Sequence, residues 1–127
     1  MIMTNEILIY IGSVIIILWG IAHIIPTKAI VKGFGAISED NKKILAMESI
    51  AEGLTLIFLG VLPLLVTILG DAQSQTAHIV YLAGGVMLLI MAVLTLFTGA
   101  RTALLPYKIC PAVKTVVAVL FIISSIL

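Results

Sequence analysis

The sequence predicts an all-α integral membrane protein, a four-helix bundle with both termini on the extracytoplasmic side. The 127 residues are 62% hydrophobic and only 10% charged, whereas an average soluble domain is about 25% charged. Four apolar runs approach or exceed the ~20 residues that a membrane-spanning helix needs. All seven Lys and Arg residues lie on one side of these runs. The composition therefore sets the class, and the charges set the orientation.

The composition also excludes other classes of protein. Disorder requires low hydrophobicity, and nucleic-acid binding requires a basic stripe that seven Lys and Arg against six Asp and Glu do not form. A single cysteine excludes an internal disulfide and the usual cysteine-based zinc sites. Membrane barrels need segments of alternating polarity, whereas these runs are apolar on every side. We expect the lipid bilayer as a partner, and no nucleic acid.

The four spans leave no room for a soluble domain, so residues 1–127 are expected to form one membrane domain. The spans cover about residues 6–25, 44–69, 77–99 and 111–127. The first span is interpreted as a retained helix and not as a signal peptide, because the N-terminus holds Glu6 and no Lys or Arg, and because the apolar run is full length.

The segments between spans carry their own signals. Residues 26–35 mix lysines with Ile, Val and Phe, which suits a short segment lying at the membrane interface. Ser38, followed by Glu39 and Asp40, predicts the start of the second helix before its apolar run. The two prolines of residues 105–111 predict an inner loop.

The positive charges orient the spans. They lie between spans one and two, or between or beside spans three and four: Lys28, Lys32, Lys42, Lys43, Arg101, Lys108 and Lys114. The N-terminus, residues 70–76 and the C-terminus carry none. The positive-inside rule then places the lysine-rich side in the cytoplasm. We therefore predict a multi-pass protein of the cell membrane.

Five residues near the cytoplasmic side are candidates for ligand binding. Glu48 and Glu52 share one helix face, and ionisable residues inside spans by default suggest function. His23 follows Trp19 by one turn and reaches the level of Glu52 if that face looks inward. Arg101 could neutralise either glutamate.

Each candidate also has a purely structural interpretation. The glutamates lie near the end of a long helix, where water and lysines reach them. An interfacial His and Trp are typical of membrane belts, and an end-of-span Arg sets topology by reaching the headgroups. His23 beside carboxylates would make a proton relay or a weak metal site, but no fixed ligand spacing is present and we assign no metal. Small residues on the first two spans predict that these spans pack closely, with Glu52 meeting His23. They are Gly12, Gly20, Ser49, Gly53 and Gly60.

The first half of the chain combines Trp19-Gly-Ile-Ala-His23-Ile-Ile-Pro26, a loop with Gly33-Phe34-Gly35, and an acidic pair early in the second span. In these features it resembles the DoxX-like group of small bacterial and archaeal membrane proteins. It implies a four-helix bundle that in some members is a subunit of a quinone-linked sulfur oxidoreductase. It carries over no catalytic residue and no cofactor.

Three functions remain open at this point. The first is a binding protein or subunit of a membrane complex, whose inner pocket takes a quinone- or lipid-like molecule. The second is a membrane-embedded enzyme that uses Glu and His as acid and base on a lipid-like substrate. The third is a proton- or cation-coupled transporter acting as a homo-oligomer, although the acids lie away from the midplane where transport sites usually lie.

Overall fold

The computed structural model describes residues 3–127, which form α-helices and no strand. The elements follow in the order α1 (Thr4–Ile24), α2 (Thr27–Gly33), α3 (Glu39–Leu69), α4 (Gln75–Phe97), the 3₁₀ helix η1 (Gly99–Arg101) and α5 (Leu105–Ile126). Four stretches are long and apolar enough to cross a membrane, namely α1, α3, α4 with η1, and α5. The predicted all-α class and the four candidate spans are confirmed.

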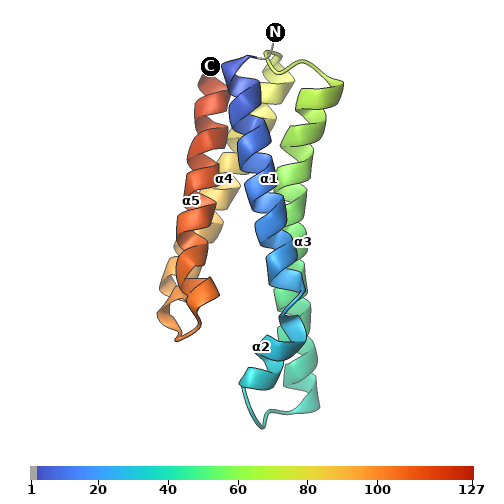
Figure 1. The fold of residues 1–127 in the computed structure, drawn as a ribbon, viewed down its shortest axis with the longest axis vertical. Helices are drawn as coiled ribbons and strands as arrows, with labels where there is room; N and C mark the ends of the chain where they lie inside the picture. Colours follow the sequence, from blue (N-terminus) through green and yellow to red (C-terminus); the bar gives the residue numbers. More distant parts are fainter. Residues whose placement is uncertain (1–2) are drawn as a thin grey trace.

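The four long helices lie side by side (Figure 1). Helix α1 packs against α3 and α5, and α4 packs against α5 and α3. The start of α1, the end of α5 and the α3–α4 connection lie at one end of the molecule, called the terminal end below. Helix α2 and the α4–α5 connection lie at the opposite end, called the α2 end.

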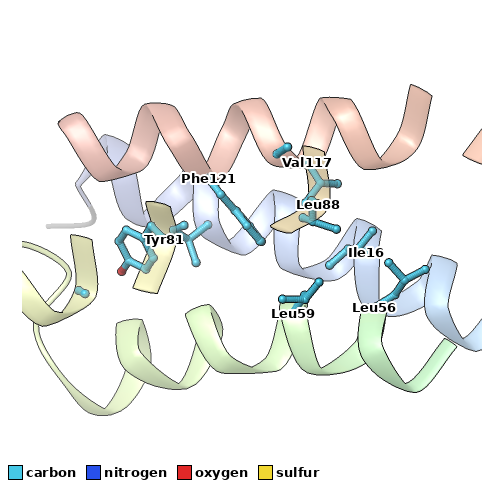
Figure 2. Close-up of a cluster of buried hydrophobic side chains, with 10 residues drawn as sticks. Ile16, Leu56, Leu59, Tyr81, Leu88, Val117 and Phe121 are labelled. Atoms are coloured by element: carbon cyan, nitrogen blue, oxygen red, sulfur yellow. The ribbon is translucent and has the colours of Figure 1, made fainter. Parts of the chain in front are cut away.

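The buried core consists of apolar side chains from all four long helices (Figure 2). Ile16, Leu56, Leu88 and Phe121 are each fully buried there, one from each helix. The outer surface is also apolar, and in each span only 33–39% of the most apolar window is buried inside the protein. Because soluble monomeric proteins rarely expose such large apolar surfaces to water, this distribution fits a chain surrounded by lipid.

Helices α1 and α3 approach closely where small residues meet. A Cβ atom added to Gly20 would lie 2.6 Å from the carbonyl oxygen of Gly53. One added to Gly60 would lie 2.6 Å from a side-chain carbon of Ile17. The predicted contact between the first two spans is therefore confirmed, with one exception. Gly12 lies against α5, where an added Cβ would be 2.7 Å from the ring of Phe121.

The predicted start of the second helix is confirmed. Helix α3 begins at Glu39, and the Ser38 hydroxyl accepts a hydrogen bond from the backbone N–H of Asn41 at 3.1 Å. This bond satisfies one of the N–H groups that have no partner inside the first turn. The short segment expected between residues 26 and 35 forms helix α2.

The inner loop predicted over residues 105–111 is wrong, because α5 already begins at Leu105. Pro106 lies in the first turn, where a missing N–H removes no intrahelical bond. Pro111 lies further inside the same helix and removes a single backbone bond without ending it. The fourth span therefore starts six residues earlier than expected, and its first turns bring Tyr107 and Cys110 onto a helix.

Candidate functional site

Glu52 forms an ion pair with Lys114 of α5, near the α2 end. The Lys114 side chain is 0% exposed and that of Glu52 is 31% exposed. The Lys114 ammonium also donates a hydrogen bond to the Thr95 hydroxyl of α4 at 2.8 Å. Burying a charge is tolerated only where it is paired and hydrogen-bonded. Three helices thus meet at one buried cation.

The sequence predicts Lys114 as one of the charges at the cytoplasmic boundary and does not predict its pairing with Glu52. A signal was present: Lys114 stands alone inside an apolar run, and Glu52 is an acid at a similar depth in another span. Arg101, the cation considered as a partner for the glutamates, is exposed and lies over the Phe97 ring at 5.4 Å. Lys114, and not Arg101, is therefore the cation that neutralises Glu52.

Cys110 lies between two side chains of α1. The indole N–H of Trp19 donates to Cys110 Sγ at 3.2 Å, and His23 Nε2 lies 3.4 Å from the same sulfur. The Trp19 and His23 rings meet edge to face, with centroids 5.9 Å apart. This face of α1 is therefore directed toward α5, while its Gly20 face packs on α3.

The predicted meeting of Glu52 and His23 takes an indirect form. One potential ligand atom from each of His23, Glu52 and Cys110 lies within 4.8 Å of the other two. This separation is within reach of one bridging water, but Lys114 is the hydrogen-bond partner of Glu52. The two side chains therefore belong to one cluster without forming the direct pair expected from the sequence.

The same three side chains offer the donor types that Zn²⁺ prefers, an imidazole nitrogen, a carboxylate oxygen and a thiolate sulfur. However, the Lys114 ammonium already forms an ion pair with a carboxylate oxygen of Glu52. A divalent cation would have to displace this ammonium and overcome its charge. The arrangement is consequently better suited to a polar organic group than to a metal ion.

Hydroxyl groups fix the end of α1 against α2 and α3. Thr27 Oγ1 and Ser49 Oγ both donate to the His23 carbonyl oxygen, at 3.2 and 3.3 Å. The two hydroxyl oxygens lie 3.2 Å apart. These contacts hold the backbone of His23 in place, so that its ring stays beside Cys110 and 5.8 Å from the ring of Tyr107.

Two hollows open beside this cluster, and Tyr107 lines both. The Glu52 hollow, of about 230 Å³, lies between α2, α3 and the η1–α5 segment and reaches both Glu48 and Glu52. The His23 hollow, of about 320 Å³, lies between the end of α1 and the start of α5 and reaches Trp19 and His23. Apolar side chains form most of both walls. Four of the five candidate residues thus line the two hollows, and Arg101 does not.

Comparisons of the chain with protein-family models, characterised proteins and solved structures found no match. The resemblance to the DoxX-like group consequently remains a prediction from the residues of the first half of the chain.

Proposed function

We propose that this protein binds a quinone- or lipid-like molecule at the α2 end, alone or as a subunit of a membrane complex. The supporting observation is the pair of hollows that Tyr107 lines together with mostly apolar side chains and a few polar groups. This combination is typical of small-molecule sites. The polar head of the ligand would lie beside Glu52 and His23, and its apolar part would extend along the outer walls.

The chemistry of the cluster favours a head that accepts hydrogen bonds. The Tyr107 hydroxyl and an N–H of the His23 ring can donate hydrogen bonds to such a head. The Lys114 ammonium already donates to Glu52 and Thr95. A quinone presents carbonyl oxygens to such donors, and its isoprenoid tail is as apolar as the walls. The quinone option also agrees with what the DoxX-like resemblance implies.

We propose further that the α2 end faces the cytoplasm, which puts the terminal end outside the cell. Six of the seven Lys and Arg residues support this orientation, since they belong to α2, the start of α3, η1 or the start of α5. Lys114 is left out because it is buried in an ion pair. The positive-inside rule links such a bias to the cytoplasmic side of the plasma membrane.

The binding proposal can be tested through Trp19, which is the single tryptophan of the chain and lines the His23 hollow. The full-length protein in detergent is titrated with a short-tailed ubiquinone analogue while indole fluorescence is recorded. We expect saturable quenching, because a bound quinone ring would lie next to the indole. Tyr107→Phe should weaken the apparent affinity several-fold, because it removes a hydroxyl that would donate to the head.

Tyr10→Phe is the matched control for Tyr107→Phe, because Tyr10 lies in the first half of α1 and lines neither hollow. It should bind like the unmodified protein. Quenching that rises linearly without saturation, as for a free indole compound in the same micelles, would contradict the proposal. So would equal affinities for the Tyr107→Phe and Tyr10→Phe variants.

An acid–base enzyme is the second candidate, supported by the proximity of His23 and Glu52 within one cluster. The two functions differ in what happens to the bound molecule. A ligand recovered unchanged after prolonged incubation indicates binding, whereas a changed mass indicates turnover.

A further inference from the structure

Helix α2 and the first turns of α3 line a third hollow, which is open to the surface and shares only Val31 with the Glu52 hollow. Its volume is about 350 Å³. Val31 and Ala46 contribute apolar surface to it. Four lysines also line it, two from each helix: Lys28, Lys32, Lys42 and Lys43. We call this site the lysine hollow. No other hollow described above has so much charge of one sign.

The lysine hollow carries an excess of positive charge. Lys42 is paired with Glu39 of the same helix at 3.1 Å, with both side chains exposed. In the part of the chain that the structure describes, no carboxylate lies within ion-pair distance of Lys28, Lys32 or Lys43. Lys28 and Lys32 are also four residues apart on one helix, where like charges destabilise each other. A bound anion would offset this repulsion.

The position of the lysine hollow suits a lipid headgroup. Helix α2 follows directly after the span formed by α1, and α3 begins before its own apolar run. From Lys43, one face of α3 continues through Met47, Ile50 and Leu54, which are 58%, 38% and 57% exposed. Residues spaced by three or four share a helix face. An acyl chain can therefore follow this apolar face away from the lysines.

We propose that the lysine hollow binds the phosphate of an anionic phospholipid, whose acyl chain lies along this face of α3. Basic pockets at the cytoplasmic side of spanning helices are suited to such headgroups. The proposal does not depend on the ligand of the Glu52 and His23 hollows, because the two sites share neither a glutamate nor an aromatic residue.

The test uses the full-length protein, delipidated in detergent and titrated with phosphatidylglycerol or phosphatidylcholine of identical acyl chains. Bound lipid is counted by native mass spectrometry. We expect saturable binding of phosphatidylglycerol and much weaker binding of phosphatidylcholine. At about 1 kcal/mol per lysine near the surface, the double variant Lys28→Gln/Lys32→Gln should lose about 30-fold in affinity. Replacing both residues with arginine should retain binding.

The double variant Arg101→Gln/Lys108→Gln is the control, because it removes the same charge from exposed positions near the same end of the protein. It should bind phosphatidylglycerol like the unmodified protein. Equal losses in the two Gln variants, or equal binding of the two lipids, would overturn the proposal. Competition by inorganic phosphate at the concentration of the lipid would also overturn it, because the site would then recognise free phosphate and not a lipid.

Discussion

Replacing Lys114 with methionine tests whether the buried ion pair stabilises the arrangement of the helices. The substitution keeps a long side chain in a fully buried position but removes the positive charge beside Glu52. Removing one partner of a buried pair typically costs about 3–5 kcal/mol, because the other charge is left uncompensated. Glu52 keeps some exposure, so we expect a loss near the lower limit, about 3 kcal/mol.

The measurement is the free energy of unfolding in detergent micelles, followed by circular dichroism as a denaturing detergent is added. The double variant Glu52→Gln/Lys114→Met is the decisive control. Replacing both charges with neutral groups is often close to neutral for stability, so most of the lost stability should return. Thr95→Val removes the hydrogen bond from the ammonium and the one that the Thr95 hydroxyl donates to the Met91 carbonyl oxygen, and it should cost about 1–2 kcal/mol.

Two results would refute this reasoning. One is a Lys114→Met variant within about 0.5 kcal/mol of the unmodified protein, the range of ordinary surface substitutions. The other is a double variant as unstable as Lys114→Met alone, which would mean that lost packing and not the uncompensated carboxylate causes the effect.

Three further predictions concern packing, orientation and metal binding. Gly53→Ala should cost about 1–3 kcal/mol of unfolding free energy by overpacking, because the added Cβ would lie 2.7 Å from a carbonyl oxygen of α1. Gly33→Ala is the control for the same unfolding assay and should not destabilise the protein, because its added Cβ would have no neighbour within 4 Å. With the native cysteine buried, a membrane-impermeant maleimide should label Gln73→Cys from outside intact cells and Ala36→Cys only after lysis; the reverse pattern would invert the proposed orientation. Lys114→Met should gain a cobalt–thiolate absorption band on titration with Co²⁺, whereas the unmodified protein should not; equal bands in both would show that the ammonium does not exclude metal.

The existence of the four candidate spans was predictable because it depends on local composition. A run of apolar residues long enough to cross a bilayer needs no information about its neighbours. The start of α3 was equally local, since the Ser38 hydroxyl bonds a backbone N–H only three residues away. The contact of α1 with α3 followed from small residues on two consecutive spans.

The composition of the site was less predictable because its contacts join distant parts of the chain. Lys114 and Glu52 are 62 residues apart, and His23 and Cys110 are 87 apart. Charge counting treats every lysine near a span end as a boundary marker, so it cannot distinguish Lys114 from an exposed lysine. The sequence also did not determine how α1 is rotated about its own axis. This helix packs against two neighbours, and its small residues divide between them, with Gly20 against α3 and Gly12 against α5.

The buried pair between α3 and α5 has a consequence for how the chain is made. Ribosomes deliver α3 before α5, so Glu52 is already in the membrane when Lys114 leaves the translocon. A lone lysine at the centre of an inserting helix costs about 2.5–3.5 kcal/mol on insertion scales, a cost that an acid waiting on an earlier helix reduces. Glu52 should therefore assist the insertion of the last helix. In the orientation proposed above, replacing it with leucine should lower the fraction of chains whose C-terminal glycosylation tag reaches the lumen of microsomes.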